Sequence, residues 1–371
     1  MRNPYVTGPY VSGRKHYGRQ TLLDALLHGE ASAYWVIGSR RIGKTSLLRQ
    51  LETIALAAPY RDRYLPIFWD MQGCNTLASL GRYLVDALQE RSEQAQRFGI
   101  TPAIALDENV LTLLPALRRA MRNADGELLL LCDETEVLIN IAAAEPEPAQ
   151  RLHAELTRGG GLRVVAVSTR RIYELQEVCR DWPTSPFLAG FDMSHILGCL
   201  TRAEAQALAT QAQADEPVQA APDVLEMVCE LTNGHPYLVQ LLCSRAFEPE
   251  EGALRALEPT DLIVDPLLGG FLDNDFGLLA PAEQQLMWIV HEQGQADAEF
   301  LAGALGQELV TIQTSLRELT ALGYLRRVEN RWQIGNHFLM QWLAAEQRRA
   351  DRGGGSLSPR ATTPQAVEAE T

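Results

Sequence analysis

Short apolar runs alternate with amphipathic stretches through the first half of the chain. Four runs lack the polar alternation of a half-exposed strand, and they are YWVIG (34–38), LPIFWDMQG (65–73), GELLLLCDETEVLI (126–139) and LRVVAVST (162–169). Between them the apolar positions recur at helical spacing, as in TSLLRQLETIALAA (45–58). Strands that alternate with helices of this kind predict an α/β fold, a parallel sheet flanked by helices on both faces.

The pattern changes at about residue 197. From there to about 265 it is wholly helical, with a capping box of Thr201 and Glu204 at the start of one helix and NGHP (233–236) separating two others. Residues 278–348 predict three helices, a tight hairpin and a last helix, the order of a winged helix. The expected organisation is an extended lead-in (1–16), an α/β domain (17–196), a helical domain (197–265), a winged-helix domain (266–348) and a disordered tail (349–371).

Composition and charge indicate the environment of the protein. Hydrophobic residues make up 46% of the 371 residues, but no apolar run approaches the roughly 18–20 residues that a membrane span requires. The first residues lack the apolar core of an export signal, and the six cysteines form no CxxC pair. We therefore expect a cytoplasmic protein with reduced thiols and no membrane partner. The net charge of −14 opposes non-specific attraction to nucleic acid.

One motif lies between the first predicted strand and the helix that follows it. Residues 38–45, GSRRIGKT, fit the pattern G-x-x-x-x-G-K-[ST], in which backbone N–H groups curl around a phosphate at a helix N-terminus. Lys44 is expected to reach the β- and γ-phosphates, and the Thr45 hydroxyl to bind Mg²⁺. The alternative interpretation is a glycine turn beside a solvated lysine. The position between a predicted strand and a helix favours the phosphate loop over that alternative. The expected nucleotide contacts are Gly38, Ser39, Arg40, Arg41, Ile42, Gly43, Lys44, Thr45 and Ser46.

Polar residues at the ends of two later strands complete the expected site. Asp133 and Glu134 follow LLLLC, and we expect Asp133 to hold Mg²⁺ with Thr45 while Glu134 orients or polarises the attacking water. The alternative is an acidic strand end that simply faces solvent. Ser168 and Thr169 end the fourth strand and are candidates to bind the γ-phosphate or the water, although the sequence does not decide which hydroxyl points inward. Glu136 is expected at the surface.

Five segments in a fixed order resemble one known family. Tyr17-Gly18-Arg19, GSRRIGKTSLLRQL (38–51), LLLLCDE (128–134), VVAVSTRR (164–171) and NGHPYLVQLL (233–242) are similar to the STAND branch of the AAA+ P-loop ATPases, in particular to bacterial and archaeal AAA-like ATPases. The resemblance covers roughly residues 8–345. It implies that the helical domain is a lid that closes on ATP.

The resemblance also implies roles for matching residues. Tyr17, Gly18 and Arg19 are expected near the adenine, and Gly234 and Pro236 at the base or ribose. Arg40 and Arg41 are expected to contact phosphate or a neighbouring subunit, and Arg245 is the nearest match to the lid arginine of many AAA+ machines. Since that match is poor, a slowly hydrolysing switch that acts through self-association or a separate effector protein is expected rather than a motor.

Two other functions stay open on the sequence. The first is a DNA-associated ATPase, which the hairpin arginines Arg326, Arg327 and Arg331 suggest. The presumed recognition helix carries only Arg317, offset by Glu318, whereas DNA readers usually place several cations there, so this function is not favoured. The second is a nucleotide-binding scaffold without turnover.

Overall fold

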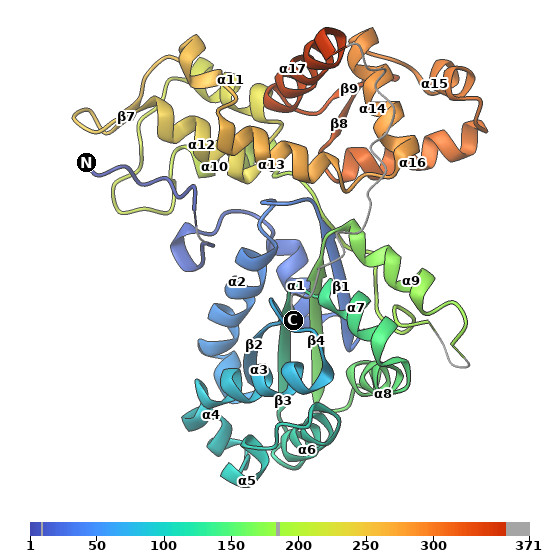
Figure 1. Ribbon diagram of the computed structural model, residues 1–371. Coiled ribbons are helices and arrows are strands. Elements are labelled where there is room, and N and C mark those ends of the chain that lie inside the picture. Colours follow the sequence, from blue (N-terminus) through green and yellow to red (C-terminus); the bar gives the residue numbers. More distant parts are fainter. Residues whose placement is uncertain (9, 183–185, 354–371) are drawn as a thin grey trace, which may run out of the picture. The chain divides into compact units, whose positions relative to one another are not determined.

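The computed structural model describes residues 1–8, 10–182 and 186–353. The chain forms two compact units (Figure 1). The first consists of Met1–Asp261 together with Ala321–Gly323, and the second of Leu262–Thr320 together with the residues from Tyr324 onward. The candidate site residues lie in the first unit.

A parallel five-stranded sheet forms the centre of the first unit. Its strands are β1 (Ala33–Gly38), β2 (Tyr64–Asp70), β3 (Glu127–Asp133), β4 (Leu162–Ser168) and β5 (Ile196–Leu197), in the order β2-β3-β4-β1-β5. Each neighbouring pair is parallel. The predicted parallel sheet is therefore confirmed, although β5 was not expected, because two residues are too short to produce a recognisable apolar run.

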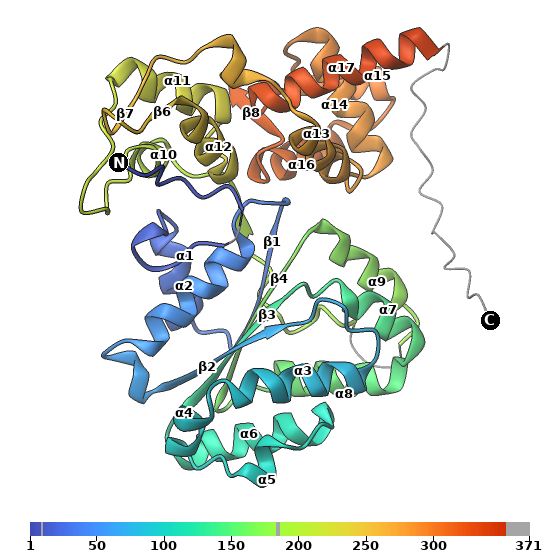
Figure 2. The ribbon, with the colours of Figure 1, turned by 60° about the vertical axis from the view of Figure 1, so that its left-hand side comes forward.

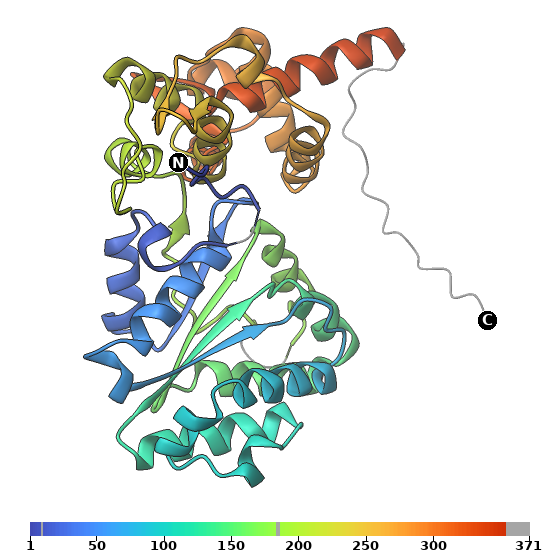
Figure 3. The same ribbon diagram turned by 90° about the vertical axis from the view of Figure 1, so that its left-hand side faces the viewer.

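Helices cover both faces of this sheet (Figures 2 and 3). On one face lie α1 (Gln20–His28) and α2 (Lys44–Leu56), and on the other α3 (Leu77–Gln89), α6 (Val110–Asn123) and α8 (Pro146–Thr157). Shorter elements complete this part, namely η1 (Gly13–Lys15), η2 (Tyr60–Asp62), α4 (Ser92–Arg97), α5 (Pro102–Ala105), α7 (Val137–Ala144), η3 (Arg170–Tyr173) and α9 (Glu174–Val178). The sheet is buried on both sides, as its unbroken apolar runs predict.

The packing of α2 determines which face of the sheet carries the site. Leu47, Leu48 and Leu51 of α2 join one buried cluster with Leu129 and Leu131 of β3, Val165 and Val167 of β4, and Val36 of β1. Successive side chains of a strand point to opposite faces. The odd-numbered residues of β3 and β4 therefore face α2, and the even-numbered ones face away from it.

The remainder of the first unit is mostly helical. It contains α10 (Arg202–Ala209), α11 (Pro222–Thr232) and α12 (Pro236–Ala246), followed by a hairpin of β6 (Phe247–Glu248) and β7 (Ala253–Leu254) and by η4 (Pro259–Leu262). The predicted capping box at α10 is confirmed, because the Thr201 hydroxyl accepts from the N–H of Glu204 and the Glu204 carboxylate accepts from that of Thr201. The wholly helical prediction for 197–265 is wrong at the hairpin, whose two-residue strands leave no periodicity.

The second unit has the predicted order of elements. After an unpredicted helix, α13 (Pro266–Phe276), come α14 (Pro281–Gln293), α15 (Ala298–Leu305), α16 (Leu309–Ala321), the antiparallel strands β8 (Leu325–Val328) and β9 (Arg331–Ile334), and α17 (His337–Gly353). Helix α17 runs past residue 349, where the tail was expected to begin. The rest of the predicted tail, 354–371, lies outside the described residues. No helix within the described ranges is long and apolar enough to cross a membrane.

The packing between α2 and the sheet leads to a stability prediction. Leu131 is 0% exposed and belongs to the cluster under α2. Replacing it with alanine should lower the free energy of unfolding by about 2–5 kcal/mol, because a cavity remains where the side chain packed. Urea denaturation followed by circular dichroism measures this loss.

The matched control is Leu106→Ala, because Leu106 is 60% exposed. That change should stay within about 0.5 kcal/mol of the unchanged protein. Equal losses in the two variants would contradict the assignment of Leu131 to the core.

Candidate functional site

A glycine-rich loop joins the end of β1 to the start of α2. It leaves the strand at Gly38, and Gly43 precedes the helix with a φ of 103°, a conformation that favours glycine. The Lys44 ammonium donates to the carbonyl oxygens of Gly38 (3.2 Å) and Ser39 (3.0 Å), so it lies across the loop. Helix α2 has 13 residues, and its first N–H groups point back toward this loop. This geometry is suited to an anion.

Two carboxylates follow β3 at the same edge of the sheet. The Thr45 hydroxyl donates to Asp133 Oδ2 at 2.7 Å, and the Glu134 N–H donates to Asp133 Oδ1 at 3.0 Å. Burial raises the pKa of Asp133 above its usual range, against the opposing effect of these two bonds and of Lys44. The pKa of Glu134 is also raised, first by partial loss of hydration and then by the charges of Glu136 and Asp133.

The two predicted hydroxyls on β4 point to opposite faces of the sheet. Ser168 is even-numbered and 0% exposed, and its Oγ accepts from the indole N–H of Trp35 at 2.8 Å on the face away from α2. The backbone stays extended through Thr169, which therefore continues the row of Val165 and Val167 on the α2 face. Of the two predicted hydroxyls, that of Thr169 is therefore the one on the α2 face, whereas that of Ser168 is bound to the buried indole of Trp35.

Glu136 is not the solvated surface residue that was expected. It is half-buried, and its Oε1 accepts from both the backbone N–H and the hydroxyl of Thr169, each at 2.6 Å. The neighbouring Thr135 hydroxyl donates to the Val167 carbonyl at 2.8 Å. The segment after β3 is thus fastened to the end of β4 by side chains.

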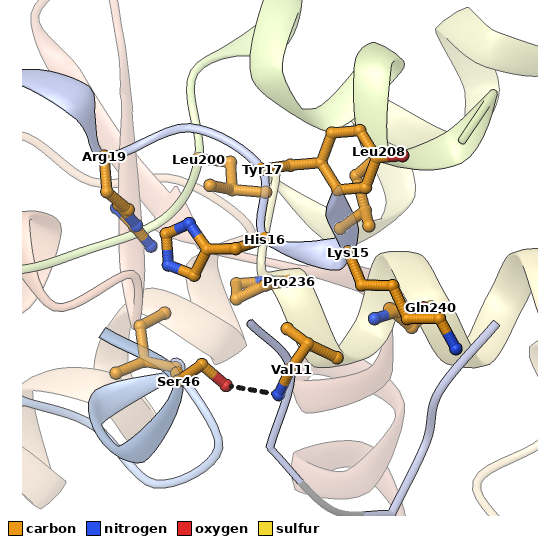
Figure 4. Close-up of a pocket in the computed structure, with 12 residues that line it drawn as sticks. Val11, Lys15, His16, Tyr17, Arg19, Ser46, Leu200, Leu208, Pro236 and Gln240 are labelled. Carbon is orange, nitrogen blue, oxygen red and sulfur yellow. Dashed lines mark hydrogen bonds between the residues drawn. The ribbon is translucent and has the colours of Figure 1, made fainter. Parts of the chain in front are cut away.

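A cavity open to solvent lies beside the loop (Figure 4). Its lining comes from the N-terminal segment, the loop and α2, and the region of α10 and α12; the residues are Val11, Lys15, His16, Tyr17, Arg19, Ile42, Gly43, Ser46, Leu200, Leu208, Pro236 and Gln240. The predicted residues Tyr17, Arg19 and Pro236 therefore meet at one cavity with Gly43 and Ser46.

Comparison with known proteins bears on the fold. No family model matches the chain, and no curated protein matches it. A solved Walker-type ATPase of Pyrococcus abyssi matches with a TM-score of 0.63 and 14% identity, covering 91% of this chain and 98% of that one. The ORC2 protein of Aeropyrum pernix, solved as ADPNP–ADP complexes, matches with a TM-score of 0.54 and 15% identity, covering 94% and 99%. The chain has the fold of a P-loop ATPase.

Within this P-loop ATPase fold, the Tyr17-Gly18-Arg19 segment is bound to α10. The Arg19 N–H donates to Glu204 Oε1 at 2.9 Å, and Gly18 lies against the same carboxylate. The Arg19 guanidinium donates to the carbonyls of Gly198 and Cys199. Tyr17 is 6% exposed, and its hydroxyl accepts from the N–H of Gln213. Tyr17 thus lines the cavity, while Arg19 connects the segment before α1 to α10 and to the residues after β5.

The predicted lid residues Gly234 and Pro236 form the turn into α12. Gly234 has a φ of 67°, and its carbonyl accepts from the Leu200 N–H at 2.9 Å. A Cβ at this position would lie 2.3 Å from the Leu200 carbonyl oxygen, so the turn needs glycine. Pro236 then begins the helix and faces the cavity.

The arginines implied by the resemblance contact the protein itself. Arg41 lies 4.6 Å from the ring centroid of Tyr237 on α12, and it donates to the Thr7 carbonyl at 3.4 Å. The charge of Arg40 partly opposes the rise in the pKa of Glu134, which burial causes. Arg245 donates to the Asp261 carbonyl at 2.6 Å, so its side chain holds α12 to η4. The loop is linked to α12 through Arg41.

The sequence analysis missed the cavity residues that precede and follow the motifs. Val11, Lys15 and His16 belong to the segment expected to be an extended lead-in, and the Val11 N–H donates to Ser46 Oγ at 3.1 Å (Figure 4). Gln240 lines the cavity one helical turn after Pro236 and accepts from the Val6 N–H at 2.8 Å. In the sequence, only the proximity of these residues to Tyr17 and Pro236 indicated that they belong to the site, because neither stretch carries a motif of its own.

Two buried histidines beside the site predict acid sensitivity. His16 and His235 are 8% and 6% exposed, and burial, aided by the charge of Arg19, lowers the pKa of each to about 4 from 6.5. Below pH 6.5 both histidines become protonated in the unfolded chain but stay neutral in the folded chain. The free energy of unfolding therefore falls as the pH decreases toward 4. Each buried histidine should lower the free energy of unfolding at pH 5 by about 2 kcal/mol relative to pH 7.5.

Urea denaturation at pH 7.5 and pH 5.0 measures this effect. His16→Gln and His235→Gln should each lose less stability on acidification than the unchanged protein. His28→Gln alters an exposed histidine and should leave the pH difference as it is. An unchanged difference in both buried variants would show that these histidines do not carry the effect.

Proposed function

We propose that this protein binds ATP with Mg²⁺ and hydrolyses it slowly, as a STAND-type AAA+ switch in which the nucleotide sets the arrangement of lid and winged-helix domain. One observation carries this proposal: Lys44 and Thr45 begin α2 at a glycine-rich loop, and Thr45 reaches Asp133 at 2.7 Å. That combination brings together a phosphate cradle, a cation and an acidic partner. The P-loop ATPase fold supports it.

The donor set at this position fits magnesium. Mg²⁺ prefers oxygen ligands, and the Thr45 hydroxyl and the Asp133 carboxylate supply two that already lie within hydrogen-bonding distance of each other. The bound ion would neutralise charge on the phosphate oxygens. Glu134, next to Asp133 and raised in pKa, is our candidate to accept a proton from the attacking water.

The cavity supports the proposed position of the adenine base and the proposed switch function. Tyr17 from the segment before α1 and Pro236 from the start of α12 both line the cavity, so a nucleotide bound there would contact both. Among the cavity-lining residues in the described ranges, the arginine is Arg19, which comes from the core side. Since the helical domain brings no arginine to this cavity within the described residues, the arrangement suits a switch with slow turnover. Its output would reach a second copy of the chain or a separate effector protein.

A pair of substitutions tests binding and hydrolysis separately. Lys44→Ala should weaken ATP binding by about 100-fold or more, roughly 2.7 kcal/mol, because the phosphates lose a charged partner. Glu134→Gln should bind ATP with little change but release phosphate about 100-fold more slowly. Isothermal titration and a phosphate-release assay measure the two quantities. Equal phosphate release by Glu134→Gln and the unchanged protein would support a scaffold without turnover instead.

DNA association is the second candidate, because Arg327 and Arg331 are exposed on the β8–β9 hairpin. However, Arg327 lies 5.2 Å from the ring centroid of Trp332 and donates to the Glu329 carbonyl and to Asn330 Oδ1. On the preceding helix, Arg317 donates to the Gln313 carbonyl. Part of the hydrogen-bonding capacity of Arg317 and Arg327 is therefore used within their own elements.

We expect no specific role for the hairpin in DNA binding. Fluorescence anisotropy with duplex DNA at two salt concentrations should give the same weak affinity for the unchanged protein and for the variant Arg326→Ala/Arg327→Ala. A salt-dependent affinity that this double substitution removes would instead favour the DNA-associated ATPase.

A further inference from the structure

We propose that Glu136 is a positioning residue for hydrolysis. Its carboxylate accepts the one hydrogen bond that the Thr169 hydroxyl can donate. Thr169 can therefore accept a hydrogen bond from the attacking water but cannot donate one to the γ-phosphate. This inference rests on the proposed ATPase activity and assigns two residues within it.

The sheet register places Thr169 where such a water would lie. Ile37 of β1 pairs with Ser168 of β4, so Thr169 is level with Gly38, the first residue of the phosphate loop. On the other side of β4 lies β3, whose last residue, Asp133, faces α2 as Thr169 does. Thr169 is 8% exposed. Its hydroxyl is thus placed between the loop and the carboxylates.

The existing hydrogen bonds of Thr169 determine which further bonds its hydroxyl can make. A threonine hydroxyl has one proton to donate and two lone pairs, whereas an ionised carboxylate only accepts. Since Glu136 Oε1 lies 2.6 Å from Thr169 Oγ1, the hydroxyl proton points to Glu136. The Thr169 N–H is donated to the same oxygen. Phosphate oxygens also only accept, so they gain nothing from Thr169, but water can donate to it.

Glu136 is itself held in place. Thr135, the residue before it, is fixed to β4 by its bond to the Val167 carbonyl, and helix α7 begins at the residue after it, Val137. Glu134, in contrast, is exposed. The structure therefore separates an exposed carboxylate, Glu134, from the half-buried carboxylate of Glu136, which orients the Thr169 hydroxyl.

With these roles, every bond and proton in the hydrolysis of ATP can be accounted for. The water oxygen bonds to the γ-phosphorus while the bond from phosphorus to the β–γ bridging oxygen breaks, and ADP leaves with that oxygen. One water proton passes to Glu134 and is then released to solvent. The other stays on the attacking oxygen, hydrogen-bonded to Thr169 Oγ1, and leaves with the phosphate.

Thr169→Val removes the hydroxyl while keeping the shape of the side chain. We expect it to lower kcat by about 10- to 100-fold, since the water loses its orientation, with the ratio of ATP to ADP affinity unchanged. Thr169→Ser should restore most of the activity. Steady-state kinetics and competition binding of ATP and ADP measure these quantities in the full chain.

Glu136→Leu should resemble Thr169→Val in kcat, and the double variant should be no slower than either single variant. Glu136→Gln keeps an acceptor oxygen, which the Thr169 N–H would select, and it should retain most of the activity. Ser168→Ala is the matched control on the opposite face: it should lose stability, because the Trp35 N–H is left without its acceptor, and keep its kcat.

A fall in ATP affinity relative to ADP in Thr169→Val would show a bond to the γ-phosphate and overturn the inference, as would an unchanged kcat. If Glu136→Leu does not fold, the two Thr169 variants still decide the matter. Absence of ATP hydrolysis in the unchanged protein would refute the proposed ATPase activity, and this inference with it. That result is distinct from a protein that hydrolyses ATP without needing the Thr169 hydroxyl.

Discussion

The bond between Thr45 and Asp133 joins the two parts of the site, and it depends on how α2 packs against the sheet. Thr45 stands at the start of α2 and Asp133 at the end of β3, so they meet only if the helix covers the face to which odd-numbered residues of β3 point. Leu47, Leu48 and Leu51 fix that choice by burial. A shift of one residue in the register of β3 would turn Asp133 to the opposite face, and the same shift in β4 would turn Thr169.

Much of this arrangement could be predicted from the sequence, because the phosphate loop is local. Eight consecutive residues between a strand and a helix define it, and the parallel sheet follows from the alternation of strands with helices. The choice between Ser168 and Thr169 could not be predicted. A strand buried on both faces is apolar on both, so its pattern does not reveal which face α2 covers.

Contacts between distant segments were also beyond the sequence. Glu136 and Thr169 are joined by two bonds, yet each residue type is common at strand ends and neither forms part of a motif. Val11 and Gln240 come from opposite ends of the first unit and meet only at the cavity. Strand β5 and the β6–β7 hairpin were missed for another reason, because two-residue strands are held by tertiary pairing rather than by propensity.

The division of roles among the carboxylates would give a physical reason for the slow turnover that we propose. Lys44, the start of α2 and a bound magnesium ion would supply positive charge at the phosphates, and Asp133 and Glu134 would serve the ion and the water. At the end of β4, however, Thr169 presents only lone pairs, because Glu136 holds its proton. A donor at that place would stabilise the charge that develops on the γ-phosphate, and such stabilisation is usually a large part of catalysis. With an acceptor there instead, water is oriented but the charge is not relieved, so bound ATP would persist long enough to act as a signal.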